Sequence, residues 1–487
     1  MPRRAGRHGR HTGAAMKTGV MLDVSRDKVP TMATLLALVE RLASWGIDHV
    51  QLYMEHTFAY APHEVVWREA SPFTADEITT LDGACRDAGI ELAPNQNCLG
   101  HMERWLRHDA YRAMAIRPDG WTDARGRERQ PTTIDPSKPS SLEFVRSLLA
   151  ELLPAFSAGV PVHVGLDEPW ELPDERFRDY VDYIAALRAA PELDGREMLV
   201  WGDIVVQHPE EAASLPAGVT ICEWGYEASH PFAERASWLR GAGVPFWLCP
   251  GTSSWNTLVG RWTNARQNIG GALAAASASD AEGVLVTDWG DNGHLQYLPA
   301  SEPHFAFLGS GAGGGGYVDV FGDSSGELVA ALRELGDVHL LVTPQVPNAS
   351  VLALPLMSPR VRVGEGFTAG VTDEQFAAVL AAIDSAVARL DRARPSRADG
   401  ALVIDEVRAS AALLSLLVDD LRLRLRCGGR VESVPRGERA LLAERLSPLV
   451  ARHRELWLSR NRPGGLDDSC GRLWRLRDVW LSADPVL

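Results

Sequence analysis

The stretch PVHVGLDEPWEL, residues 161–172, joins an apolar run to a group of acidic and aromatic side chains. Such a run is typical of a parallel strand buried on both faces, and its end places two carboxylates, Asp167 and Glu168, side by side. Adjacent side chains on a straight strand point to opposite faces, so His163, Gly165 and Asp167 should share the inner face. Because a proline follows Glu168, the chain should turn there. We therefore expect both carboxylates to reach the strand end, but from different directions.

The same order of apolar strand, polar turn and amphipathic helix recurs along the first two thirds of the chain. The expected strands are GVMLDVS (19–25), DHVQLYME (48–55), IELAPNQ (90–96), VPVHVGLDE (160–168), EMLVWGDI (197–204), VTICEWGY (219–226), PFWLCPGTS (245–253) and GVLVTDWGD (283–291). This rhythm over roughly 270 residues predicts an α/β fold of the (β/α)₈ TIM-barrel type. A doubly wound sheet is the alternative, but LDVSRDKVP lacks the glycine turn that usually follows the first strand of such a sheet.

The ends of these strands are polar, whereas their bodies are apolar. They read SRD, MEH, NQN, DEPW, WGD, EWGYE, GTSSW and DWGD. Active sites of TIM barrels lie at the C-terminal ends of the strands. Acidic, amide and tryptophan side chains therefore gather where a barrel would carry its site.

Three segments are expected along the chain. Residues 1–16 are basic without the apolar run of a secretory signal, which predicts a disordered tail or a true start at Met16. We assign the barrel to residues 17–322 and a smaller all-helical C-terminal domain to residues 323–487, where leucine and arginine recur at helical spacing. The segment GSGAGGGG (309–316) contains G-x-G-x-x-G, but no convincing strand precedes it, so we interpret it as a loop.

Composition narrows the class of partner. Hydrophobic residues at 45% and charged residues at 23% describe a soluble globular protein, and a net charge of −15 argues against a nucleic-acid partner. The six cysteines show no zinc-binding spacing, so we expect reduced thiols and no metal or other cofactor. Without an apolar run of membrane-spanning length, no membrane contact is expected. We expect a cytoplasmic protein with a glycan or small glycoside as its partner, and a homo-oligomer stays open.

Tryptophans form a second group at the strand ends. They are Trp170, Trp201, Trp224, Trp255 and Trp289. Aromatic rings suit the apolar C–H faces of a pyranose, and nearby carboxylates and amides suit its hydroxyl groups. The set predicts a pocket of the size of a sugar.

At this point the motifs resemble those of a known family. HVGLDE (163–168) is similar to the H-x-G-[GA]-D-E signature of the family 20 glycoside hydrolases, the β-N-acetylhexosaminidases. VMLDVSRD (20–27) resembles their first-strand motif, LGH (99–101) their P-G-H, and DWGD (288–291) their last-strand W-x-E. The four matches occur in the family's order and together cover roughly residues 19–295, most of the predicted barrel.

The resemblance implies substrate-assisted catalysis, one of the exceptions to the scheme of two catalytic carboxylates. The 2-acetamido oxygen of the sugar would attack its own anomeric carbon, giving an oxazolinium ion and net retention. Glu168 would be the general acid and then the base, and Asp167 would orient the acetamido N–H. The expected activity is that of a retaining exo-β-N-acetylhexosaminidase on terminal GlcNAc or GalNAc.

The resemblance implies further roles at the mouth of the barrel. Glu55 would support His163 in a Glu55–His163–Glu168 relay, and His101 would line the same polar base. Trp289 and Asp291 would bind the sugar near its 4- and 6-hydroxyls. The acetamido methyl and the ring would be walled by Trp201, Trp224 and Trp255.

The chain also departs from the family. Thr18 stands where the family has an arginine that grips the 3- and 4-hydroxyls, and Leu166 replaces a small residue of the signature. The tyrosine that holds the acetamido carbonyl has no counterpart on the seventh strand. Tyr226 is a candidate replacement for it, and Arg26 or Arg261 for the arginine.

Two other functions stay open. One is a glycosidase for a sugar without an acetamido group, with Asp203 or Asp291 as the nucleophile. The other is a non-catalytic sugar-binding barrel.

Overall fold

The structure is a computed structural model that describes residues 16–123, 126–311 and 320–482. The expected N-terminal tail, apart from Met16, and most of the glycine-rich segment 309–316 lie outside the described residues.

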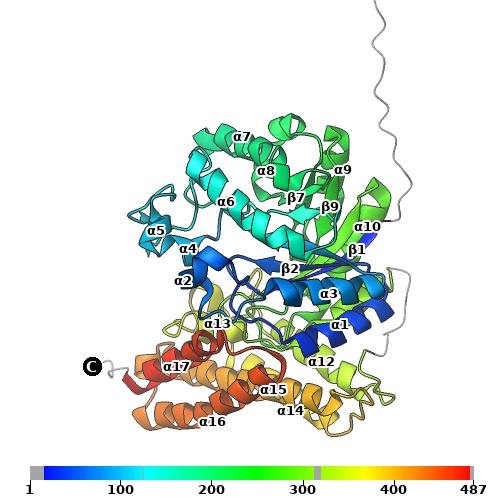
Figure 1. The fold of residues 1–487 in the computed structure, drawn as a ribbon. Helices are drawn as coiled ribbons and strands as arrows, with labels where there is room; N and C mark the ends of the chain where they lie inside the picture. The colour runs from blue at the N-terminus through cyan, green and yellow to red at the C-terminus, as the bar shows by residue number, and fades with distance from the viewer. Residues whose placement is uncertain (1–15, 124–125, 312–319, 483–487) are drawn as a thin grey trace, which may run out of the picture.

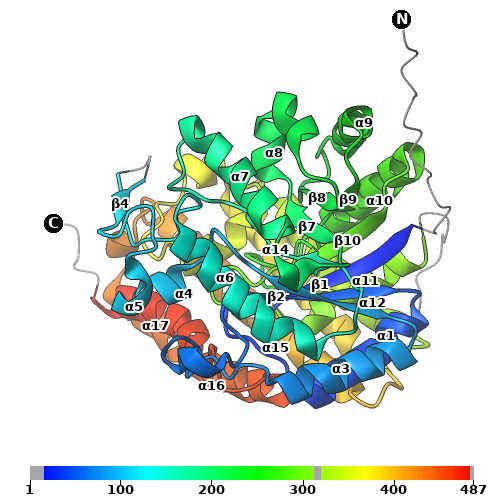
Figure 2. The same ribbon diagram turned by 45° about the horizontal axis from the view of Figure 1, so that its top comes forward.

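Eight parallel strands close into a barrel in the order β1-β10-β9-β8-β7-β6-β3-β2, which confirms the predicted fold (Figures 1 and 2). The barrel closes through β1, whose Leu22 lies opposite Leu52 on one side and Asp288 on the other. The strands are β1 (Lys17–Asp23), β2 (His49–Met54), β3 (Glu91–Gln96), β6 (Val162–His163), β7 (Met198–Trp201), β8 (Val219–Trp224), β9 (Phe246–Cys249) and β10 (Gly283–Asp288).

Helices cover the outside of the barrel. The main ones are α1 (Met32–Ser44), α3 (Ala75–Asp87), α6 (Pro139–Leu152), α7 (Phe177–Arg188), α8 (Asp203–Gln207), α9 (Phe232–Ala242), α10 (Trp262–Ser279) and α11 (Glu302–Gly309). Helix α3 begins with a capping box, in which Thr74 and Glu77 each accept from the other's backbone N–H.

The connection from β3 to α6 holds elements that the sequence pattern did not predict. They are two short helices, α4 (Glu103–Leu106) and α5 (Asp109–Arg112), and a hairpin of β4 (Trp121–Thr122) with β5 (Glu128–Arg129). Another short helix, α2 (Glu64–Trp67), follows β2. Elements of two to four residues are too short to carry a hydrophobic period.

The barrel interior holds a compact cluster of large side chains. Trp201, Trp255 and Trp289 pack there with sulfur-bearing and aliphatic side chains from β1, β7, β8, β9 and β10. Cys222 and Cys249 belong to this cluster, and all six cysteines are free thiols, as expected. Across the described ranges, every helix is too short or too polar to span a membrane.

The C-terminal part is helical, as predicted, and lies below the barrel in Figure 1, coloured yellow to red. Its elements are α12 (Glu327–Asp337), α13 (Leu354–Met357), α14 (Asp373–Leu390), α15 (Gly400–Arg426), α16 (Arg436–Arg460) and α17 (Leu466–Ser482). It contacts the β1–α1 connection, where Thr31 N–H donates to the Arg460 carbonyl at 2.9 Å and Arg462 N–H donates to the Val29 carbonyl at 2.8 Å.

Candidate active site

The chain after β6 leaves strand geometry well before the acidic pair. Strand β6 ends at His163, and Gly165, Leu166 and Glu168 have φ values of 71°, 73° and 47°. A Cβ on Gly165 would lie 2.6 Å from Asn97 Oδ1, so the close approach of this loop to the β3 end requires glycine. The expected straight strand over residues 160–168 is therefore wrong beyond His163, because the backbone turns into the left-handed region.

This turn brings the two carboxylates to one partner. His101 Nε2 lies 3.3 Å from Asp167 Oδ2 and 3.3 Å from Glu168 Oε2. The bent backbone thus brings both carboxylates within reach of the same imidazole nitrogen. His101 itself has a φ of 53°, and the preceding Gly100 is so close that a Cβ there would lie 2.2 Å from the Asp167 carbonyl oxygen.

The charge on His101 is set by the acids around it. Burial opposes protonation, but the carboxylates of Asp167, Glu168 and Glu55 outweigh it and raise the pKa of His101 well above its usual range. His101 Nδ1 faces Glu55 Oε1 at 3.9 Å. The imidazole therefore lies between Glu55 and the acidic pair as a cation.

Asp167 is a buried carboxylate that stays ionised. Burial acts to raise its pKa, but the charge of His101 and hydrogen bonds from His101 and Asn97 lower it below the usual range. Asn97 Nδ2 donates to Asp167 Oδ1 at 2.8 Å, and Asn97 Oδ1 accepts from the Leu166 N–H at 3.2 Å. Sequence reasoning placed Asn97 at a polar strand end, but did not select it as a site residue.

Glu55 and Asp291 meet at one arginine. Arg26 Nη1 lies 3.2 Å from Glu55 Oε1, and Arg26 Nη2 lies 3.3 Å from Asp291 Oδ1. Burial raises the pKa of Glu55 to about 7 against the opposing charges of Arg26 and His101. Of the two arginines considered as replacements, Arg26 thus lies among the predicted site residues, whereas Arg261 is held by both carboxylate oxygens of Glu227 at 2.9 and 2.8 Å.

His163 does not lie between Glu55 and Glu168. Its Nδ1 contacts Gln51 Oε1 at 2.9 Å and Asn95 Nδ2 at 3.1 Å, and its ring centroid lies 4.2 Å from that of Trp201. Burial lowers the pKa of His163 to about 3, so the ring is neutral. The predicted Glu55–His163–Glu168 relay is therefore wrong in its histidine. His163 lies in the barrel interior, and His101 lies between Glu55 and Glu168 instead.

Aromatic side chains at and after the ends of β7, β8, β9 and β10 contact one another. Trp224 stacks on Tyr226 with ring centroids 5.2 Å apart, and Tyr226 meets Trp255 edge to face at 5.1 Å. Trp289 Nε1 donates to the Tyr226 hydroxyl at 2.8 Å, and its ring lies 5.9 Å from Trp201. Four of the five predicted tryptophans thus belong to one connected group with Tyr226, whereas Trp170 is 58% exposed.

Asp203 supports the loop that carries the acids. Its Oδ2 accepts from the Glu168 backbone N–H at 3.0 Å, and burial together with the charge of Asp167 raises the pKa of Asp203 to about 7. Among the described residues, no group of three or more His, Cys, Asp or Glu side chains could hold a metal ion.

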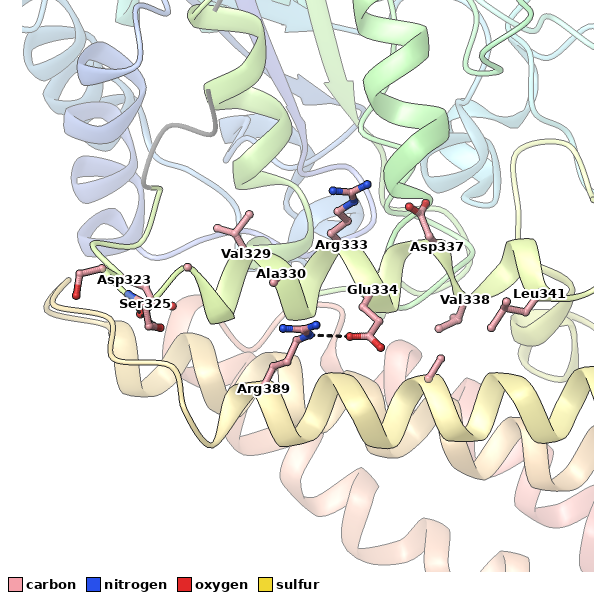
Figure 3. Close-up of a pocket in the computed structure, with 13 residues that line it drawn as sticks. Asp323, Ser325, Val329, Ala330, Arg333, Glu334, Asp337, Val338, Leu341 and Arg389 are labelled. Carbon is pink, nitrogen blue, oxygen red and sulfur yellow. Dashed lines mark hydrogen bonds and ion pairs between the residues drawn. The ribbon is translucent and has the colours of Figure 1, made fainter. Parts of the chain in front are cut away.

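A cavity of about 820 Å³ lies elsewhere, between α12 and α14 (Figure 3). Arg389 of α14 reaches across it to Glu334 of α12, with Nε and Oε2 2.9 Å apart. None of the predicted site residues lines this cavity, so we do not include it in the site.

The fold and site define a TIM-barrel protein with acidic and aromatic side chains at the ends of its strands. One curated protein and several solved structures are similar to it. Hexosaminidase D from Bos taurus is 22% identical over 312 residues, which are 57% of this chain and 86% of that protein. Among solved structures, the chitobiase of Flavobacterium johnsoniae aligns over 90% of this chain and 78% of its own, with a TM-score of 0.50 and 14% identity.

A second solved structure is the GH20 β-N-acetylhexosaminidase from Streptomyces coelicolor A3(2). It aligns over 66% of this chain and 68% of its own, with a TM-score of 0.47 and 15% identity. No family model matches the chain. The curated relative is named as a hexosaminidase and the chitobiase structure as a GH20 protein, in agreement with the resemblance to family 20 seen in HVGLDE.

Proposed function

We propose that this chain is a retaining exo-β-N-acetylhexosaminidase that removes terminal β-linked GlcNAc or GalNAc by substrate-assisted catalysis. The observation that carries the proposal is the convergence of Asp167 and Glu168 on His101 Nε2, at 3.3 Å each. In the usual retaining mechanism, acid and nucleophile flank the glycosidic bond about 5 Å apart. Two neighbouring acids on one side of an imidazole suit a reaction in which the substrate supplies the nucleophile.

The two acids differ in the way that this reaction needs. The Glu168 side chain is 31% exposed, whereas that of Asp167 is 9% exposed. Glu168 is therefore the acid that can reach the leaving oxygen, protonate it, and later deprotonate water. Asp167, held ionised by His101 and Asn97, accepts the acetamido N–H and stabilises the positive charge that forms on the oxazolinium.

The expected rate enhancements are large enough for a mechanism without a nucleophile from the protein. A positioned intramolecular nucleophile reaches effective molarities of about 10⁵ M or more. General acid–base catalysis adds about 10²–10⁴-fold. The remaining roles are binding: the partly exposed Trp224 contacts the apolar sugar surface, the buried Trp201 and Trp255 support that wall, and Arg26 with Asp291 binds hydroxyl groups.

Specific observations weaken the alternative with a protein nucleophile. A nucleophilic carboxylate must be ionised, but burial raises the pKa of Asp203 to about 7, and its Oδ2 is engaged by the Glu168 N–H. Burial also raises the pKa of Asp291, which pairs with Arg26. We therefore assign supporting roles to both.

A panel of 4-nitrophenyl glycosides tests the proposal. We expect hydrolysis of the β-N-acetylglucosaminide or β-N-acetylgalactosaminide, and little or none of the matched β-glucoside and β-galactoside. A thiazoline mimic of the intermediate should inhibit. Equal turnover of substrates without the acetamido group, or a covalent glycosyl group trapped on Asp203 or Asp291, would contradict substrate assistance. Calorimetric sugar binding without any hydrolysis would indicate a non-catalytic barrel instead.

The pH profile offers a separate prediction. His101→Gln removes the charge that helps to keep the pKa of Asp167 low, so this pKa should rise. Because catalysis needs Asp167 ionised, the acidic limb of the kcat/KM profile should move to higher pH. The measurement is kcat/KM against pH for the best substrate of the panel, with His108→Gln as the control on the same connection. An acidic limb at the wild-type pH in His101→Gln would refute the coupling.

A further inference from the structure

The buried Lys28 is an unusual residue in this chain. The sequence contains 49 lysines and arginines, but lysine occurs only at positions 17, 28 and 138. Lys28 lies between β1 and α1 and is 6% exposed. Burial lowers its pKa to about 7, which reflects a strongly desolvated ammonium group.

The ammonium group of Lys28 joins the barrel to the helical part. Lys28 Nζ donates to the backbone carbonyls of His294 at 3.0 Å and Gln296 at 2.6 Å. It also lies 5.0 Å from the ring centroid of Trp457, on α16, and 5.8 Å from that of Tyr297. The lysine therefore lies between the last barrel loop and the helical part.

That loop, residues 289–296, carries two predicted sugar-binding residues, Trp289 and Asp291. Its backbone enters the left-handed region at three successive residues, since Asn292, Gly293 and His294 have φ values of 57°, 93° and 49°, and His294 is strained there because it is neither glycine nor asparagine. Such strain persists only where the surroundings hold it.

Two further contacts hold the loop. Gln296 Nε2 donates to the Trp289 carbonyl at 2.6 Å. Arg472 Nη1, from α17, donates to Asn292 Oδ1 at 3.2 Å. Lys28 donates to the carbonyls of His294 and Gln296, at the C-terminal end of the same loop. These two hydrogen bonds hold the end of the loop that the Gln296 side chain connects to Trp289.

We propose that Lys28 is a positioning residue that clamps loop 289–296 against the helical part and so sets the sugar-binding wall formed by Trp289 and Asp291. This inference rests on the proposed hexosaminidase function. It gives the helical part a role in substrate binding, because Trp457 and Arg472 complete the clamp. Lys28 touches neither the acidic pair nor the reacting atoms, so its loss should affect binding more than chemistry.

Lys28→Met tests the clamp, because it keeps the length of the side chain and removes the donor. For the best 4-nitrophenyl N-acetylhexosaminide we expect KM to rise about tenfold and kcat to change less than about twofold. Amide hydrogen exchange over residues 289–296 should become faster than in the wild type. The matched control is Lys138→Met, because Lys138 Nζ also donates to two backbone carbonyls, those of Ala113 at 2.8 Å and Ala115 at 3.1 Å.

Lys28→Arg is the conservative variant. A cavity of about 60 Å³ adjoins Lys28, so a guanidinium group can be placed there, and KM should return toward the wild-type value. If Lys28→Met does not fold, Arg472→Met replaces it, with the same expected rise in KM and in exchange over residues 289–296.

Unchanged KM, unchanged exchange, or a change in only one of them would overturn the clamp. If the wild-type chain hydrolyses and binds no N-acetylhexosaminide, the proposed function fails by itself. The clamp is then judged by the exchange measurement alone, where wild-type rates over residues 289–296 in Lys28→Met would refute it.

Discussion

Glu168→Gln is expected to lower kcat for the 4-nitrophenyl N-acetylhexosaminide by about 10²–10⁴-fold, with KM nearly unchanged. Glutamine keeps the size of the side chain but can neither protonate the leaving oxygen nor deprotonate water. The remaining rate should be higher for substrates whose leaving group needs no proton, because the acetamido nucleophile is still present. Steady-state kinetics on the 4-nitrophenyl N-acetylhexosaminide and on N-acetylhexosaminides with more basic aryl leaving groups measures this.

Glu175→Gln is the matched control for this variant. Glu175 is exposed and lies on the same connection after β6, so its conversion to the amide should leave kcat at the wild-type value. Full activity in Glu168→Gln would remove this residue from the mechanism and the proposed reaction with it.

Asp167→Asn is expected to lower kcat/KM by about 10²-fold, because one hydrogen bond to a charged group is lost at the developing oxazolinium. The neutral amide cannot balance the positive charge that forms on the acetamido nitrogen. The same variant should bind the thiazoline mimic more weakly by a similar factor, since the mimic presents that charge.

A matched change for Asp167→Asn is Asp182→Asn, on the exposed side of α7. Asp182 pairs with Arg178 on the surface, so its loss should leave both kcat/KM and thiazoline affinity unaltered. Wild-type thiazoline affinity in Asp167→Asn would show that this carboxylate does not face the acetamido group.

The barrel was predictable because each buried parallel strand is a short apolar run with a polar end, and this signal is local. Strands β2 and β3 begin and end within a residue of the expected bounds. The segment after His163 was not predictable in the same way. Its left-handed turns at Gly165 and Leu166 are held by Asn97, a residue distant in sequence, so the apolar pattern of a strand continued where the strand itself did not.

The same limit applies to the residues around the acids. The sequence indicated Asp167, Glu168 and the tryptophans from their places at strand ends, but it could not decide which histidine lies between Glu55 and Glu168. That choice depends on how closely Gly100 lets the β3 loop approach the Asp167 carbonyl. Contacts between the barrel and the helical part, such as those of Lys28, join segments that no local pattern relates.

The capping residue of α3 also contacts the helical part of the chain. Glu77, which caps the start of α3, also pairs with Arg462 of the helical part, with Oε1 and Nη2 2.8 Å apart. The Glu77 carboxylate thus caps a helix that packs on the first strands and also binds a segment near the end of the chain. Loss of the helical part would leave α3 with a weakened start, so the two parts should unfold in one transition and not as independent units.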